Sequence, residues 1–139
     1  MLLTPKRRKF RKEHVKQISG IASNGYAVSF GEYGLKALDN GFISNRQVES
    51  ARKVITRYIR KVGKIWIRVF PRVPITSHGM EMPMGKGKGD VAYYACRIRK
   101  GTVLFEIGGV PFEIAKSTLL KASKKLSVGT EFVWTGLVK

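Results

Sequence analysis

The sequence predicts an α+β fold in which two main helices pack on a mixed or antiparallel sheet. Three observations support this prediction. Two segments place apolar residues at helical spacing, several others alternate apolar and polar residues, and the two kinds follow one another irregularly rather than as repeated strand–helix units. A chain of 139 residues is most simply one domain. We expect a basic N-terminal arm over residues 1–20 and a folded domain over 21–139 that carries a long basic loop at 71–90.

The charge of the chain is one-sided, with 27 Lys and Arg against nine Asp and Glu and a net charge of +18. Solubility needs a net charge of only about 2 to 8 in a small domain, and the excess destabilises the compact state by self-repulsion. A polyanionic partner explains the charge better. Nucleic acid is favoured over a membrane surface, because basic membrane-binding helices also present a large apolar face. No apolar run approaches the ~18 residues of a membrane span, and the first residues lack the pattern of a removable presequence.

The first charged segment spans residues 6–16, where Glu13 is the single acid. Such a block repels itself and holds little to bury, so we expect it to be extended or disordered until a polyanion binds it. A solvated tail is the alternative. The cations of this segment are Lys6, Arg7, Arg8, Lys9, Arg11, Lys12 and Lys16.

Residues 26–38 mix aromatic and β-branched residues with glycine. This composition is typical of β-strands, so it predicts one or two strands with a bend at Gly31 or Gly34. The following residues, 39–42, read DNGF and mark a turn.

Residues 44–62 predict the first helix. Ser44 is a favourable N-cap, Gln47 completes a capping box, and Gly63 is placed to end the helix. The expected buried face comprises Val48, Ala51, Val54, Ile55, Tyr58, Ile59 and Val62. The opposite face carries four cations that are either solvated or in contact with phosphate: Arg46, Lys53, Arg57 and Arg60.

Residues 63–71 alternate apolar and polar side chains at a period of two and predict a strand. One face, with Ile65, Ile67 and Val69, belongs to a core. The other face carries Lys64, Trp66, Arg68 and Phe70. Alternating cations and aromatic rings suit phosphate contact combined with stacking on a base or sugar. The alternative is that Trp66 and Phe70 pack beneath a neighbouring loop.

The segment from 71 to 90 has little hydrophobic pattern and is predicted to be a long loop, which in a compact domain is usually functional or disordered. Residues 91–99 and 102–107 are predicted strands. The short turn at Lys100 and Gly101 between them indicates a β-hairpin.

The C-terminal part predicts a second helix and a last strand. Pro111 suits the first turn of a helix that runs to about Leu126. The expected buried stripe comprises Phe112, Ala115, Leu119, Ala122 and Leu126, and the expected exposed cations are Lys116, Lys121, Lys124 and Lys125. Residues 130–138 predict the closing strand.

The motif MGKGKG within the loop does not fit a nucleotide-binding site. A phosphate-binding loop needs GxxxxGK followed by Ser or Thr, but five residues separate Gly79 from Gly85, and Gly87 follows Lys86. The dinucleotide fingerprint GxGxxG fails on spacing as well. Small glycines, mobile lysines and flexible methionines instead suit a thin cationic loop that enters a crevice in folded RNA.

Neither a metal site nor a catalytic centre is indicated. His14, His78 and Cys96 are far apart in the sequence, without paired ligand spacing. Cys96 lies in a predicted strand, where a small buried hydrophobe is the ordinary interpretation. We therefore expect no enzyme, no cofactor and no metal. A small phosphate-ester enzyme that uses the GKGKG loop for anion binding is the remaining catalytic alternative.

Several segments together resemble the bacterial-type family of large-subunit ribosomal protein sixteen, whose eukaryotic counterpart is large-subunit protein ten. They are TPKRRKFRKEH, SFGEYGLKAL, SNRQVESARKVITRYIRKVGKIWIRVFPRVPIT, MGKGKG and VLFEIGGVP. The resemblance covers nearly the whole chain and implies a single domain of the α/β-hammerhead type. It implies a structural constituent of the large ribosomal subunit that binds large-subunit rRNA, lies beside neighbouring ribosomal proteins and helps shape the aminoacyl and peptidyl tRNA region. No homo-oligomer is expected.

By the resemblance, rRNA contact falls on the arm residues Lys6, Arg7, Arg8, Lys9, Arg11 and Lys12 and on Lys64, Trp66 and Arg68. Proximity to tRNA falls on Met84, Gly85, Lys86, Gly87 and Lys88. The family usually has Arg where this chain has Pro83. We expect a bacterial ribosome or, by a weak preference, a mitochondrial or other organellar one. Another RNA-binding assembly factor of similar fold is the alternative among binding proteins.

Overall fold

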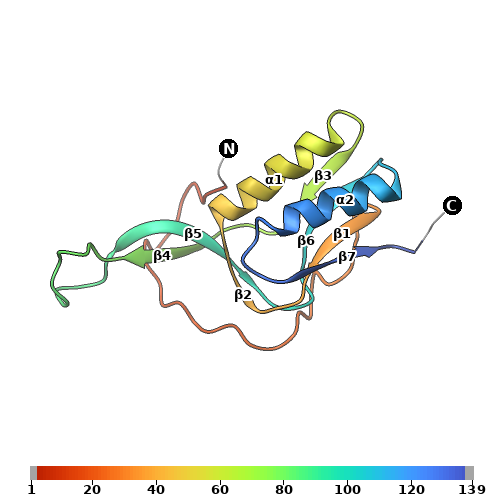
Figure 1. Ribbon diagram of the computed structural model, residues 1–139. Helices are drawn as coiled ribbons and strands as arrows, with labels where there is room; N and C mark the ends of the chain where they lie inside the picture. The colour runs from red at the N-terminus through yellow and green to blue at the C-terminus, as the bar shows by residue number, and fades with distance from the viewer. Residues whose placement is uncertain (1–2, 137–139) are drawn as a thin grey trace.

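The computed structural model describes residues 3–136. Within them the chain forms two antiparallel sheets and two helices (Figure 1). In chain order the elements are β1 (Tyr33–Ala37), β2 (Gly41–Ser44), α1 (Asn45–Ile59), β3 (Lys64–Ile67), β4 (Val73–Ser77), β5 (Asp90–Ile98), β6 (Val103–Gly108), α2 (Phe112–Ser123) and β7 (Thr130–Trp134). The predicted α+β class with two helices is confirmed.

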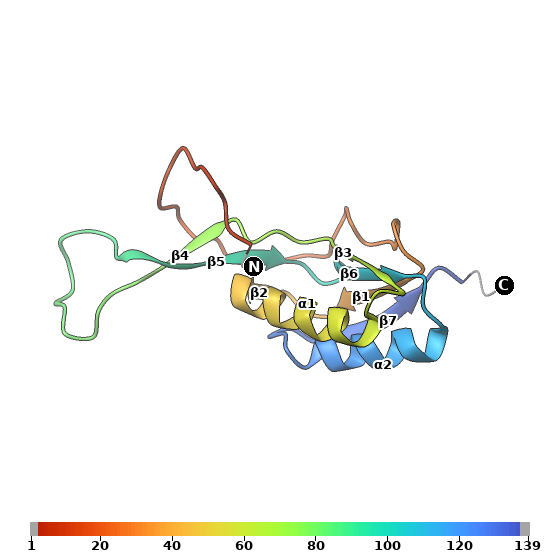
Figure 2. The ribbon, with the colours of Figure 1, turned by 90° about the horizontal axis from the view of Figure 1, so that it is seen from above.

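The four-stranded sheet has the order β3-β6-β1-β7 and the three-stranded sheet the order β2-β5-β4. Strand β6 lies inside the larger sheet, and every residue in it is buried. Both helices cover one side of the sheets, whereas the N-terminal residues run across the other side (Figure 2). The side left without helices is therefore crossed by the basic arm and by the segment that leads from it to β1.

Helix α1 begins as the sequence predicts. The Gln47 N–H donates to the Ser44 hydroxyl (3.2 Å) and the Ser44 N–H donates to the Gln47 side chain (2.9 Å), which completes the capping box. The helix ends at Ile59 rather than near residue 62, because Arg60 has a φ of 49°. The side chain of Val62 is consequently 78% exposed rather than part of the core.

Tyr58 was also predicted to be buried, and this is wrong. Its side chain lies at the outer edge of the contact between the helices and is 47% exposed, with the Nζ atom of Lys121 4.0 Å from the centre of its ring. The other predicted core positions of α1 are buried or half-buried. The hydrophobic core that they join comprises, among others, Leu35, Ile43, Val48, Ile55, Phe105, Ile107 and Leu119.

The predicted hairpin between residues 91–99 and 102–107 is wrong. The turn does form, since the Thr102 N–H donates to the Arg99 carbonyl (3.1 Å) and Gly101 takes a φ of 95°. The strands on either side, however, enter different sheets: β5 pairs with β2 and β4, and β6 pairs with β1 and β3. Each strand thus already has two neighbours, and the turn connects the sheets.

The predicted long loop is shorter than expected, because residues 73–77 form β4 and pair with β5. This strand contains Pro74, which is tolerated because β4 lies at the edge of its sheet. The irregular part is residues 78–89. This loop and the two strands that carry it, here called the finger, project away from the body of the protein (Figures 1 and 2).

The remaining elements follow the prediction with shorter bounds. Helix α2 ends at Ser123 rather than near Leu126, and β3 ends at Ile67, after which the Arg68 N–H still donates to the Leu104 carbonyl (3.0 Å). Strand β7 ends at Trp134; the predicted continuation to 138 lies partly outside the described residues. In the described part of the chain, no helix is long and apolar enough to cross a membrane.

Candidate nucleic-acid interface

Six of the seven cations of the N-terminal arm, those expected to contact rRNA, divide into two groups. Four of them, Lys6, Arg7, Lys9 and Arg11, have exposed side chains, and among residues 3–136 none has an ion-pair partner. The other two hold the arm to the protein. Arg8 donates to the Arg72 carbonyl and pairs with Glu13 (2.7 Å). The arm is thus extended, one of the two states expected for it, but it is fastened to the body at Arg8 by contacts within the protein.

Lys12 forms the second attachment, which reaches the finger. Its Nζ atom donates to the Lys88 carbonyl (2.9 Å), and the Nζ atom of Lys88 donates to the Glu13 carbonyl (2.6 Å). Lys12 also lies 3.9 Å from the Asp90 carboxylate. We call this reciprocal pair of lysine–backbone hydrogen bonds the clasp. It ties the arm to the base of the finger, although more than 70 residues separate the two in sequence.

The tip of the finger is exposed throughout, and Met80 and Met84 make almost no contact with the rest of the chain. Gly85 and Gly87 have φ values of 106° and 109°, and Lys86 between them has a φ of 61°. Residues other than glycine are strained at such positive φ values. A side chain added at either glycine would meet no other atom, so the space around both is open. Glycine here permits a left-handed backbone and leaves room for a partner to approach.

The predicted cations of α1 lie on its exposed face. Arg46, Lys53, Arg57 and Arg60 point away from the core. The acid on this helix, Glu49, is 6% exposed and accepts two hydrogen bonds from the Arg52 guanidinium (2.6 and 2.9 Å). These hydrogen bonds lower the pKa of Glu49 to about 2, so the carboxylate is ionised at neutral pH and its charge is paired with Arg52 rather than with the exposed cations.

The outward face of β3 serves two different purposes. Lys64 is exposed, with its Nζ atom 5.3 Å from the centre of the Trp66 ring. Trp66 is half-buried and lies against Gly31 and Gly108. The alternative that it packs beneath a neighbouring loop therefore holds for one part of its ring, while the other part stays exposed. Arg68 points into the protein and not toward solvent, where RNA would bind.

The partner of Arg68 is Glu106, which is fully buried in β6. Arg68 forms an ion pair with this carboxylate, and the N–H groups of Ser29, Phe30 and Gly31 donate to it as well. Burial alone would raise the pKa of Glu106, but these donors outweigh it and hold the pKa below its ordinary value. Because the carboxylate takes these N–H groups, residues 29–31 form a loop. Of the one or two strands predicted over 26–38 with a bend at Gly31 or Gly34, one forms, β1, and it follows a bend at Gly31.

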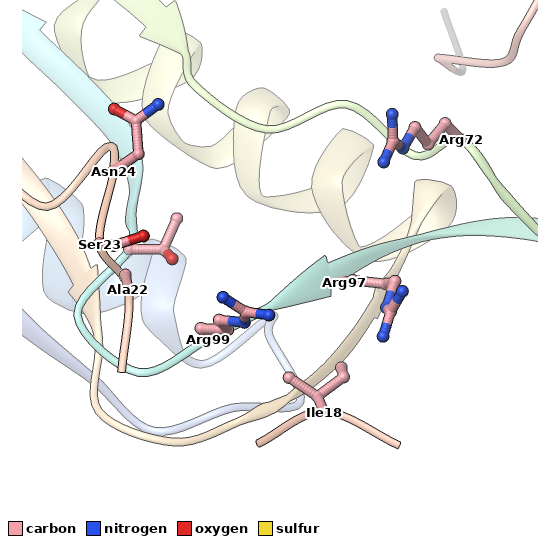
Figure 3. A pocket seen from close by; sticks show the side chains of 8 residues that line it. Ile18, Ala22, Ser23, Asn24, Arg72, Arg97 and Arg99 are labelled. Carbon is pink, nitrogen blue, oxygen red and sulfur yellow. The ribbon is translucent and has the colours of Figure 1, made fainter. Parts of the chain in front are cut away.

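Three arginines that the sequence pattern did not single out come together beside the arm. Arg72, Arg97 and Arg99 line a cavity of about 270 Å³ with Ser23 and Asn24 (Figure 3). The signal available in the sequence was Arg97-Ile98-Arg99, which places two cations on one face of a strand. Their approach to Arg72 depends on the pairing of β4 with β5, which was not predicted.

The site offers donors and positive charge but no set of metal ligands. Within residues 3–136 no group of three or more His, Cys, Asp and Glu side chains lies together. Cys96 is buried, and burial raises the pKa of its thiol to about 12, so it is protonated at neutral pH and unsuited to nucleophilic chemistry. The arrangement can hold a polyanion through charge and hydrogen bonds.

Comparison with known proteins gives a consistent result. The family model described as Ribosomal protein L16p/L10e matches residues 5–133. The Large ribosomal subunit protein uL16 of Allorhizobium ampelinum is 50% identical over 132 residues, covering 95% of this chain and 96% of that protein. The proteins of the same name from Aeromonas hydrophila and Rhizobium etli are 51% and 49% identical over the same length. The similarity therefore extends over nearly the whole chain, from the arm to the last strand.

Proposed function

The chain belongs to the ribosomal protein L16p/L10e family, and on this premise we propose that its cationic surfaces hold large-subunit rRNA while its finger approaches bound tRNA. It is a structural constituent of the large ribosomal subunit and not an enzyme. The observation that carries the proposal is the family match over residues 5–133, which includes both the arm and the finger. Its partners are rRNA and neighbouring ribosomal proteins.

The rRNA contacts that we propose begin with the unpaired cations of the arm. Lys6, Arg7, Lys9 and Arg11 would bind phosphates directly, while Arg8 and Lys12 hold the arm in place. The exposed face of α1 and the pair Lys64–Trp66 add further positive charge. Contacts of this kind fix the position of a protein on nucleic acid without reading its sequence. We assign Arg68 a supporting role, since its ion pair with Glu106 shapes the loop at residues 29–31.

The tRNA contacts that we propose lie at Met84, Gly85, Lys86 and Gly87 in the tip of the finger and at Lys88, which the clasp holds near its base. The open space around the two glycines would allow close approach to a ribose–phosphate backbone. Lys86 would supply charge there, whereas Lys88 would act mainly through the clasp. Pro83, where the family usually has Arg, fixes the backbone at the entrance to this segment.

The protein should act as one copy in a bacterial or organellar ribosome. The known relatives described above are bacterial. Which of the two kinds of ribosome holds this chain stays a prediction, as does its monomeric state. Charge neutralisation at the arm and α1 would hold rRNA helices together, and no covalent bond would be made or broken.

Sedimentation of native particles tests the structural role. After a moderate salt wash, the protein is expected in mature large subunits at one copy per particle. Its presence only on immature particles would favour an assembly factor instead. Turnover of a nucleotide that disappears in Lys86→Ala would revive the enzymatic alternative, and absence from every ribosomal particle would overturn the proposal.

The role of the finger is tested by the double variant Lys86→Ala and Lys88→Ala. We expect tRNA accommodation to weaken several-fold while incorporation into the subunit stays close to that of the wild type, because the exposed cations of the arm and of α1 are unchanged even though the Lys88–Glu13 hydrogen bond of the clasp is lost. Lys124→Ala with Lys125→Ala, at exposed positions just after α2, is the control of equal charge loss. If incorporation collapses and accommodation by the remaining particles is normal, the finger is an rRNA anchor.

A further inference from the structure

A groove lined by five arginines lies between the N-terminal arm and the three-stranded sheet. The cavity in Figure 3 is lined by Arg72, Arg97 and Arg99. A second cavity, of about 400 Å³, shares Arg72 and Arg97 and is lined also by Arg7 and Arg8. Because two residues belong to both cavities, we treat the two as one feature and call it the arginine groove.

The positions of these arginines follow from the strand geometry. Ile98 at the end of β5 is fully buried, so its neighbours Arg97 and Arg99 lie on the exposed face of the sheet. Arg72 comes directly before β4, the neighbour of β5, and is exposed as well. On the arm side Ser23 and Asn24 add a hydroxyl and an amide. The Asn24 Oδ1 atom accepts the Gly25 N–H (2.9 Å), which leaves its NH₂ group as a further donor.

The charge of the groove is not balanced by the protein. Among the described residues, no carboxylate lies within ion-pair distance of Arg72, Arg97 or Arg99. Arg97 makes one long hydrogen bond, to the Lys16 carbonyl (3.4 Å). Glu13 is the single acid that lines either cavity, and it pairs with Arg8. Like charges gathered in this way destabilise the compact state unless an anion binds between them.

We propose that the arginine groove is a phosphate-binding site that takes the backbone of one RNA strand between the arm and the sheet. This inference rests on the proposed rRNA-binding function and names a part of the surface through which it acts. Arginine suits the role, because its planar guanidinium donates two parallel hydrogen bonds to one phosphate. No aromatic side chain lines either cavity, so bases are not stacked there and binding depends on the backbone.

The test measures binding of the full chain to large-subunit rRNA over a range of salt concentrations. The groove variant combines Arg72→Gln, Arg97→Gln and Arg99→Gln. The control variant combines Lys116→Gln, Lys124→Gln and Lys125→Gln, which removes the same charge from exposed positions on α2 and just after it. The slope of log K against log[salt] is negative, and each phosphate that is no longer bound reduces its magnitude by about 0.7 to 0.9. We expect this magnitude to fall by about 2 to 3 in the groove variant and by less than about 1 in the control.

A third variant separates geometry from charge. Replacing the same three arginines by lysine keeps the charge but removes the bidentate hydrogen bonds, so we expect the salt slope to be kept and the affinity to fall about tenfold. Thermal unfolding of each variant shows that the fold is intact. Should one variant fail to fold, the single substitutions Arg97→Gln and Lys124→Gln provide the same comparison, with an expected slope difference of about 0.7 to 0.9.

Three outcomes would count against these proposals. Equal slopes in the groove and control variants, with wild-type binding intact, would overturn the groove and leave the proposed function standing. A wild-type protein that binds no rRNA would overturn the proposed function itself. Competition by inorganic tripolyphosphate as strong, per phosphate, as competition by RNA would indicate a site for free phosphates rather than for an RNA strand.

Discussion

Glu106 shows how a single buried charge shapes the surface of this protein. The carboxylate lies in β6 with no exposure and binds Arg68 together with three backbone N–H groups of residues 29–31. Phe30 next to these groups packs against Arg68, with 5.2 Å between the guanidinium carbon and the ring centre. A cation that the sequence pattern assigns to nucleic acid therefore also fastens the loop that follows the arm. Removing one partner of such a buried ion pair is strongly destabilising.

The first prediction concerns Arg68→Met, which keeps much of the side-chain volume but leaves Glu106 buried without its ion-pair partner. Breaking a buried pair costs about 3 to 5 kcal/mol, and the three backbone donors that remain favour the lower end. Urea unfolding at neutral pH measures the loss. Lys53→Met on the exposed face of α1 is the control, with an expected change within about 0.5 kcal/mol. The double variant Arg68→Met with Glu106→Gln should regain part of the lost unfolding free energy. If Arg68→Met loses no more than the control variant, the ion pair does not stabilise the fold.

A second prediction at the residue scale concerns pH and Glu49. The hydrogen bonds from Arg52 lower its pKa from 4.5 to about 2 in the folded protein. A carboxyl group whose pKa is lowered on folding contributes stability above its ordinary pKa, and this contribution disappears as the pH falls toward the folded value. The difference in unfolding free energy between the wild type and Glu49→Gln should therefore be largest above about pH 5 and shrink toward pH 2. Unfolding curves across this range measure it, and a difference independent of pH would show that the charge is not responsible.

At the scale of elements, the clasp connects the two basic segments of the chain. Lys12 and Lys88 each donate to a carbonyl on the other segment, and Lys12 lies near Asp90 at the start of β5. The base of the finger is thus held by the arm as well as by the pairing of β4 with β5. Binding of the arm to rRNA would fix the direction in which the finger points.

Deletion of residues 1–12 should have two measurable effects. The salt slope of RNA binding should fall by about 0.7 to 0.9 for each phosphate that the arm no longer binds. Amide hydrogen exchange in residues 78–89 should also become faster, because Lys12 no longer holds the Lys88 carbonyl. The variant Lys6→Gln, Lys9→Gln and Arg11→Gln keeps the clasp, so we expect it to lower the slope without changing exchange in the finger. An unchanged slope in both variants would mean that the arm is a solvated tail.

The elements also show what the sequence alone could predict. Local signals were reliable where a single segment decides its own structure, as in the capping box of Ser44 with Gln47 and the alternation of Ile65 and Ile67. They failed where structure depends on distant partners. Strand β4 exists because β5 lies beside it, and residues 29–31 leave the strand pattern because Glu106, far along the chain, takes their N–H groups. The arginine groove was missed for the same reason.

At the scale of the whole molecule, the helices lie on one side of the sheets and the cationic arm runs across the other (Figure 2). The apolar faces of α1 and α2 complete the core, while the exposed cations of α1, the arm, the groove and the finger remain available for contact. The net charge of +18 opposes compactness in the isolated protein and is offset when phosphates replace solvent ions around it.

An electron cryomicroscopy map of native large ribosomal subunits that contain this chain would test the proposed contacts of the arm, the groove and the finger together. We expect rRNA phosphates within hydrogen-bonding distance of Lys6, Arg7, Lys9 and Arg11 and of the arginine groove, and a finger whose tip reaches the tRNA-binding region. A subunit in which the arm and the groove face solvent, with the finger folded away from tRNA, would contradict both proposals.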